Sequence, residues 1–278
     1  MKNKSNYLNR LYLALVCALI PACALADEEI SVRGGLSNIK QKLILAPQAG
    51  SMDDLNRGLA RYDKGDFRGA LADINKAILK DPLNSQALFY RGLVRENLGD
   101  YVNAVSDFEQ NRVAAFDPIV LSEKAYCQTN MYELNAAMLS LNRALAQDHS
   151  SSDAAIAFSR RAIVKRLLHN APDAINDCNQ ALKLVPDSVE TKWQRGITYC
   201  SMRKYPDAIL DLQFVVQSAP RFADGHYTLA ECFRVTGRGS DALSEYKKAL
   251  ALFNEQNNAH GKQSAQTKIA ELSKSGIK

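Results

Sequence analysis

The stretch RGLARYDKGDFRGALADINKAI, residues 57–78, is followed by a close copy of itself, RGLVRENLGDYVNAVSDFEQNR, residues 91–112. The second stretch begins 34 residues after the first. From Ala70 to Ile78 the apolar residues recur at spacings that place them on one face of a helix. The two stretches therefore predict a helical unit that occurs more than once in the chain.

Three columns of small residues extend this repeat to six copies. The columns contain Gly58, Gly92, Ala125, Ala162, Gly196 and Ala230; then Ala70, Ala104, Ala137, Ala174, Ala208 and Ala242; then Ala77, Asn111, Ala144, Ala181, Val215 and Ala249. In every column the steps are 34, 33, 37, 34 and 34 residues. Chance does not reproduce the same irregular steps three times. Units this small cannot bury an apolar face alone, so they must stack on one another.

The pattern resembles the tetratricopeptide repeat family, whose 34-residue unit has small residues at these three columns. Pro82, Pro186 and Pro220 fill the turn that closes the family's unit, and Gly65-Asp66-Phe67 matches the turn between its two helices. Repeats 3 and 4 depart from that turn motif. The resemblance implies an all-α fold, a right-handed superhelical solenoid of about six repeats with a C-terminal capping helix.

The same register predicts the domain boundaries. Residues 1–26 form a signal peptide, 27–50 a lead-in segment, 51–256 the repeats, and 257–278 the capping helix and tail. The expected repeats cover residues 51–84, 85–117, 118–154, 155–188, 189–222 and 223–256. The extra residues of the long step fall in the Ser-rich stretch 148–152, which we interpret as a flexible point.

The first 26 residues have the composition of an export signal. A basic start precedes an apolar run from Leu11 to Leu25, and Ala24-Leu25-Ala26 forms an A-x-A cleavage site. We therefore expect an exported, periplasmic protein. In an alternative reading, Cys23 ends a weak lipobox and is acylated, which would give a membrane-anchored lipoprotein.

Charge argues against nucleic acid as a partner. The signal holds 3 of the 35 Lys and Arg residues, which leaves 32 against 30 Asp and Glu residues. A nearly balanced chain lacks the basic footprint of a nucleic-acid-binding domain. A basic column runs just before the first small column, and an acidic column lies 16 residues later, with both members present in repeats 1, 2, 4 and 5. We interpret these columns as structural ion pairs, with a basic stripe for acidic ligands as the alternative.

No motif indicates a cofactor, a metal site or an enzyme. The sequence has no C-x-x-C, H-E-x-x-H, G-x-S-x-G or phosphate-binding glycine loop. We therefore expect no cofactor and no catalysis, and keep an uncharacterised envelope hydrolase as an alternative. The mature chain would retain Cys127, Cys178, Cys200 and Cys232. Packing as small hydrophobes is favoured over disulfides, and Cys178 occupies a core column.

The family resemblance also implies a binding surface, because the first helix of each unit lines the concave face in that family. Matching positions give a candidate groove for a protein or peptide partner that consists of Tyr62, Phe89, Tyr90, Tyr126, Arg160, Arg166, Trp193, Tyr227 and Arg234. Tyr, Trp and Arg often dominate interface energies. Truncating Trp193 to Ala is expected to weaken binding with little loss of fold. The predicted function is a protein-interaction scaffold in the cell envelope.

Overall fold

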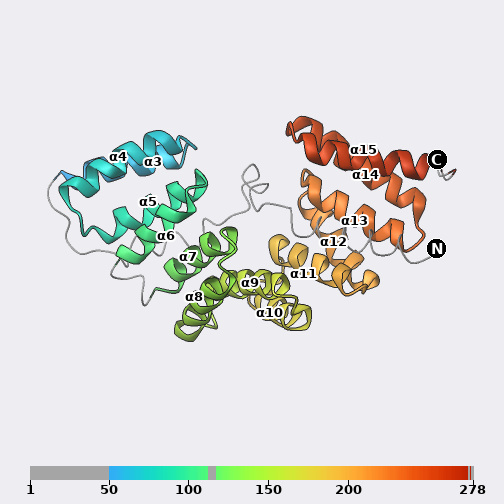
Figure 1. The fold of residues 1–278 in the computed structure, drawn as a ribbon, viewed down its shortest axis with the longest axis horizontal. Coiled ribbons are helices and arrows are strands. Elements are labelled where there is room, and N and C mark those ends of the chain that lie inside the picture. Colours follow the sequence, from blue (N-terminus) through green and yellow to red (C-terminus); the bar gives the residue numbers. More distant parts are fainter. Residues whose placement is uncertain (1–49, 112–116, 275, 277–278) are drawn as a thin grey trace. The chain divides into compact units, whose positions relative to one another are not determined.

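A computed structural model describes residues 50–111, 117–274 and 276. The predicted signal peptide, Cys23 and residues 27–49 of the lead-in segment lie outside the described residues. Every regular element in the described part is an α-helix, which confirms the all-α fold (Figure 1). No described helix is both long enough and apolar enough to cross a membrane.

The helices follow one another as pairs joined by short turns. We call the first helix of each pair the A helix and the second the B helix. The A helices are α3 (Ser51–Tyr62), α5 (Ser85–Asn97), α7 (Pro118–Asn130), α9 (Ser152–Leu167), α11 (Val189–Ser201) and α13 (Ala223–Val235). The B helices are α4 (Phe67–Lys80), α6 (Tyr101–Gln110), α8 (Leu134–Gln147), α10 (Ala171–Leu184), α12 (Tyr205–Ser218) and α14 (Gly239–Glu255), and α15 (Ala259–Lys274) follows them.

The described chain divides into two compact units, and the division falls between Val164 and Lys165. In the N-terminal unit α4 packs on both α3 and α5, α6 packs on both α5 and α7, and α8 packs on α7. In the C-terminal unit neighbouring helices from α10 to α15 pack in the same sequential way. Each of these helices thus buries its apolar face against its neighbours in the chain, as in a solenoid of stacked repeats.

The division does not fall at the predicted flexible point, and the local contacts explain why. Asp148 accepts hydrogen bonds from the backbone N–H groups of Ser150 and Ser151, at 3.0 and 3.2 Å. The hydroxyl of Ser151 accepts from the N–H groups of Asp153 and Ala154, at 3.1 and 3.2 Å, and so caps α9. The Ser-rich stretch is an ordered helix start.

Small residues let the two helices of a pair approach closely. A Cβ atom on Gly92 would lie 2.5 Å from the ring of Phe108, and one on Gly196 would lie 2.9 Å from Leu212. The six members of the Ala70 column are all completely buried. Larger side chains at these columns would separate the two helices or distort the contact between them. We call this contact the joint of the pair.

The turn from the A helix to the B helix uses one backbone conformation in all six pairs. The residue seven positions after the first small column has a positive φ in each of them: Gly65, Gly99, Tyr132, His169, Arg203 and Gly237. Glycine adopts this conformation freely, whereas the Cβ atom of other L-residues makes it energetically unfavourable. The turns of repeats 3 and 4 differ in sequence from the family motif, but they keep its backbone shape.

Candidate functional site

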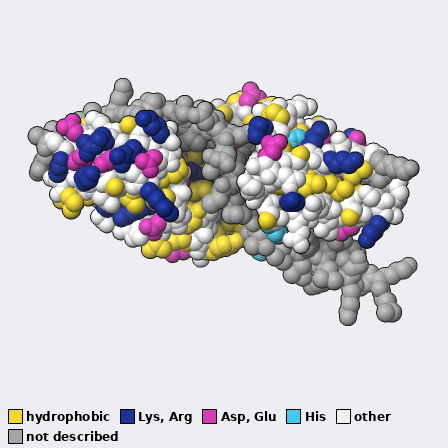
Figure 2. All heavy atoms as spheres, turned by 90° about the horizontal axis from the view of Figure 1, so that it is seen from above, with side chains coloured by type: hydrophobic (Ala, Val, Ile, Leu, Met, Phe, Trp, Pro, Cys, Tyr) yellow, Lys and Arg dark blue, Asp and Glu magenta, His cyan; other side chains and the backbone are white. Residues whose placement is uncertain are grey.

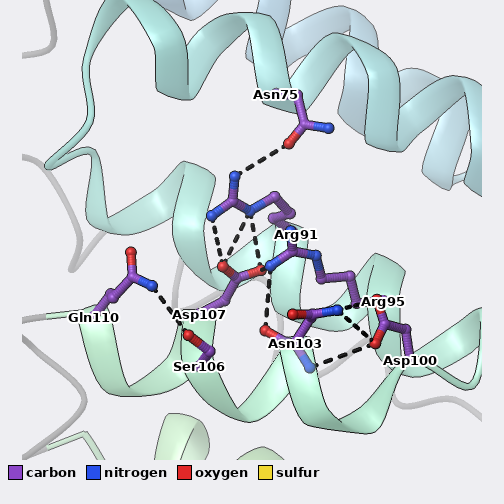
Figure 3. Close-up of polar contacts among 8 residues, drawn as sticks. All are labelled: Asn75, Arg91, Arg95, Asp100, Asn103, Ser106, Asp107 and Gln110. Atoms are coloured by element: carbon purple, nitrogen blue, oxygen red, sulfur yellow. Dashed lines mark hydrogen bonds and ion pairs between the residues drawn. The ribbon is translucent and has the colours of Figure 1, made fainter.

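The predicted basic and acidic columns meet between the two helices of a pair. In Figure 3, Arg91 of α5 binds Asp107 of α6 through Nη2, at 2.6 Å, and through Nε, at 3.0 and 3.1 Å. Arg195 binds Asp211 in the same way, with two contacts of 2.7 Å. Arg57 lies 3.6 Å from Asp73. These contacts confirm the structural interpretation for repeats 1, 2 and 5.

The sequence did not reveal two further members of this network. A second basic residue, one helical turn after the first, binds the same carboxylate: Arg61 and Asp73 lie 3.3 Å apart, Arg95 and Asp107 2.6 Å, and Lys165 and Asp177 2.7 Å. In addition, Asn75 and Asn179, from the preceding B helices, accept from the guanidinium groups of Arg91 and Arg195. The network therefore joins successive repeats.

In repeats 1, 2 and 5 the basic side chains of the column already bind carboxylates within the fold, so they are poor anchors for an acidic ligand. Basic and acidic side chains are interspersed over the face drawn in Figure 2. The basic stripe is therefore a poor candidate for the binding site, and the predicted groove residues become the candidate site.

The structure separates the nine predicted groove residues into two sets. Five are partly exposed: Tyr62, Tyr126, Arg160, Arg166 and Arg234. Four are buried: Phe89, Tyr90, Trp193 and Tyr227. Phe89 has no exposed surface and its ring lies 6.0 Å from that of Phe108, so it belongs to the core between helices.

Burial also corrects the expectation for Trp193. Its side chain is only 5% exposed, and its ring meets that of Phe222 edge-on, with 4.9 Å between the centroids. Truncating such a ring to Ala typically costs about 3–5 kcal/mol of stability. The fold would therefore suffer together with any binding. Tyr227 is packed in a similar way against Tyr246, at 5.4 Å.

Three successive A helices of the N-terminal unit bring charged groups together. Arg160 of α9 binds Glu123 of α7, with 2.7 Å between Nη2 and Oε2, and donates to Ser122 at 3.2 Å. Its guanidinium lies over the ring of Tyr126, 5.2 Å from the centroid. Arg160 and Tyr126 were predicted site residues, and the structure places them in contact.

A second carboxylate, Glu96 of α5, belongs to the same cluster. The Sγ atom of Cys127 donates to its Oε2 atom at 3.6 Å. Burial and, next, the charge of Glu123 raise the pKa of Glu96 well above its ordinary value, while Arg160 acts in the opposite direction. We call Glu96, Glu123, Tyr126 and Arg160 the acidic cluster, because two carboxylates share one guanidinium.

The phenol of Tyr62, from α3, lies in the field of this cluster. Burial and then the charges of Glu96 and Glu123 raise the pKa of Tyr62 to about 12. The amide of Asn97 donates to its hydroxyl at 3.5 Å. The groove predicted from the sequence consists of aromatic and Arg residues, so it omits both glutamates. Their positions on A helices were the available signal.

The A helices of the C-terminal unit present polar atoms that lack a partner among the described residues. Such atoms include Nε1 of Trp193 and Oε1 of Gln194, both buried. On the next A helix, α13, burial raises the pKa of Asp224 to about 6. Arg234, a predicted site residue, binds Glu231 at 2.7 Å. An unpaired buried polar group costs about 1–3 kcal/mol, so a bound partner could satisfy these groups.

The described residues include no group of three or more His, Cys, Asp or Glu side chains that could hold a metal ion. The A-helix surfaces of the two units offer groups for non-covalent binding: carboxylates for a cation, aromatic edges, and hydrogen-bonding atoms.

Comparisons with known proteins agree with the repeat. A sequence profile described as "Tetratricopeptide repeat" matches residues 55–115 and 194–257. Sperm-associated antigen 1 of Mus musculus is 33% identical over 96 residues, which cover 34% of this chain and 10% of that protein. The chain thus spans about a tenth of the length of this relative.

Two solved structures have a similar fold. The first, from a crystal structure of the APC/C hetero-tetramer Cut9-Hcn1, has a TM-score of 0.72 and 16% identity over 95% of this chain and 48% of that one. The second, PilW, a type IV pilus biogenesis factor, has a TM-score of 0.67 and 16% identity over 79% of this chain and 99% of that one.

Proposed function

Because this chain is a tetratricopeptide repeat protein, we propose that it is a protein-interaction scaffold whose A helices bind a segment of a partner protein. The observation that carries the proposal is the acidic cluster, in which side chains of α5, α7 and α9 converge on one place in the N-terminal unit. Successive A helices contribute to one surface, which is how a stack of repeats builds an extended binding site.

The charge of the cluster defines the chemistry of the partner. Glu96 and Glu123 together carry two potential negative charges against the single positive charge of Arg160. A Lys or Arg side chain of the partner would supply the missing charge and would lie near the rings of Tyr62 and Tyr126. The bound segment is therefore basic at the position that faces Glu96.

The C-terminal unit offers hydrogen-bonding atoms of its own to a protein partner. An extended peptide offers both a carbonyl acceptor for Nε1 of Trp193 and an N–H donor for Oε1 of Gln194. The amide of Gln194 now donates to Glu190 at 3.0 Å. Both side chains must turn toward the partner, a rotamer change that is common at interfaces.

We further propose that the scaffold acts in the cell envelope, because residues 1–26 have the composition of a signal peptide. Intact-mass measurement of the exported protein tests this. A chain that begins at Asp27 supports a periplasmic protein, and a chain that begins at an acylated Cys23 supports the lipoprotein instead. A chain that keeps its first 26 residues contradicts both.

Photo-crosslinking in cells tests the binding surface directly. A photoreactive amino acid replaces Tyr126, which is partly exposed on α7, or, as the matched control, Leu139, which is 54% exposed on the B helix α8. We expect a protein adduct from position 126 and none from position 139. Equal adducts from the two positions would contradict the assignment of the A-helix surface.

Glu96→Gln then tests the charge. This substitution keeps the shape of the side chain and removes its ability to ionise beside a basic partner residue, so it should reduce adduct formation from position 126, most strongly at low salt. An unchanged yield would sink the basic-segment proposal and leave the scaffold itself untouched.

A further inference from the structure

Two cysteines of the C-terminal unit meet between neighbouring A helices. Cys200 lies in the last turn of α11 and Cys232 in the last turns of α13, and their Sγ atoms are 2.6 Å apart. Two thiols in ordinary packing contact lie much farther apart. The separation approaches the bond length of a disulfide, about 2.05 Å.

The pair is held by regular structure on both sides. Cys200 is 6% exposed and Cys232 is 1% exposed. Both α11 and α13 pack on the B helix α12, which lies between them in the chain. Sulfur atoms that face each other from two packed helices meet the requirement of proximity, which most cysteine pairs fail.

The other two described cysteines are in different surroundings. Cys178 is completely buried in its predicted core column, and burial raises the pKa of its thiol to about 12. Cys127, in the N-terminal unit, donates to the carboxylate of Glu96, and burial raises the pKa of its thiol. High thiol pKa values make both residues poor nucleophiles, as expected for cysteines that act as small hydrophobes.

We propose that Cys200 and Cys232 form an intramolecular disulfide that ties α11 to α13. In the first step the thiolate of one cysteine attacks a disulfide oxidant, either a small-molecule disulfide or a disulfide oxidoreductase, and one sulfur of the oxidant leaves as a thiolate. The thiolate of the second cysteine then attacks the protein sulfur of the mixed disulfide and releases the other sulfur. Overall, the two protein thiols lose two protons and two electrons, and the oxidant disulfide becomes two thiols.

Burial determines when this bond forms. An oxidant cannot reach sulfur atoms that are 6% and 1% exposed, so the exchange occurs before α13 packs on α11. Once formed, the bond is shielded from reductants. The inference concerns folding in an oxidising compartment, where such bonds persist, and it does not depend on partner binding.

The cross-link closes the chain from residue 200 to residue 232, which restricts the unfolded state and stabilises the C-terminal unit. It also fixes the relation between α11 and α13, the helices that carry Trp193 and Tyr227. The A-helix surface of repeats 5 and 6 would therefore be preorganised for a partner.

Peptide mapping of the full chain, produced in an oxidising compartment, tests the bond. The protein is unfolded without reductant, alkylated and digested with trypsin. We expect GITYCSMR (196–203) and FADGHYTLAECFR (222–234) as one linked species, about 2 Da lighter than the two thiol peptides together. The peptides of Cys127 and Cys178 should be alkylated. Alkylated Cys200 and Cys232, or a link to a different cysteine, would overturn the proposal.

Thermal unfolding with and without reductant gives a second readout. The wild-type Tm should fall on the order of 10 °C when the protein is reduced while unfolded and then refolded. A Cys200→Ala/Cys232→Ala variant should have a Tm that does not respond to reductant, whereas the matched control Cys178→Ala should keep the response. A wild-type Tm that ignores reductant would count against the bond, even if the double variant fails to fold.

Discussion

Two joints bind a B-helix carboxylate with different residues: the joint between α5 and α6, and the joint between α13 and α14. In the first, Asp107 is completely buried and binds Arg91 and Arg95, whose side chains are 14% and 20% exposed (Figure 3). In the second, Leu229 replaces the arginine of the column, and Glu245 instead binds His226 and Lys248, at 2.6 and 2.7 Å. Lys248 is 55% exposed.

The difference teaches that the joint requires a satisfied carboxylate on the B helix and does not require a particular cation. His226 reaches Glu245 through Nδ1 while Nε2 lies 3.0 Å from the carbonyl oxygen of Pro220. Both ring nitrogens therefore face acceptors. The contribution of each joint to stability depends on how deeply its cationic side chains are buried.

The largest effect is expected from breaking the buried joint. Asp107→Ala leaves two arginines that are largely buried without their carboxylate, which should cost about 3–5 kcal/mol. Hydrogen exchange should become faster in α5 and α6, and chemical unfolding should begin at a lower denaturant concentration. Asp73→Ala is the matched control, because its partners Arg57 and Arg61 are 52% and 46% exposed. Equal losses in the two variants would contradict the role of burial.

A smaller effect is expected from filling the contact beside that joint. Gly92→Ala would place a Cβ atom 2.5 Å from the rigid ring of Phe108, so we expect a loss of about 1–3 kcal/mol in chemical unfolding. Repeat 6 already has Ala230 in this column, opposite the column of Tyr246. The reverse change, Ala230→Gly, should cost less, about 0.5–1 kcal/mol, through backbone entropy. If Gly92→Ala left the free energy of unfolding unchanged, Phe108 would be able to move away from the added Cβ atom, contrary to this prediction.

The smallest effect is expected from pH at the second joint. Burial raises the pKa of Glu245, but hydrogen bonds from His226 and Lys248 outweigh this effect and leave the pKa below its ordinary value of 4.5. The stabilisation is present above pH 4.5 and is lost as the pH falls through the lowered pKa. Hydrogen exchange in α13 and α14 should speed up over that range, and Glu245→Gln should flatten the response. A response of equal size in the variant would exclude Glu245 as its source.

The repeat itself could be predicted from the sequence because it depends on size and spacing alone. The Ala70 column and Cys178 are buried as expected, and the ion pairs of Arg91 and Arg195 lie where the charge columns indicate. The acidic cluster could not be predicted in the same way. Glu123 and Arg160 share one position, two residues before the first small column, whereas Glu96 lies four residues after it. A shared column does not show which side chains meet, because their contact depends on how α5, α7 and α9 stack.

Sequence alone therefore determined the register of the six repeats, the helix pairs and the small residues at their joints. These features follow from local periodicity and from the size of each side chain. Tertiary structure decided which groups are removed from water. It placed Phe89 and Trp193 in packed positions, gave Tyr132, His169 and Arg203 the left-handed turn of glycine, and brought Cys200 against Cys232. Each outcome depends on residues of neighbouring helices, which a pattern read along one chain segment does not contain.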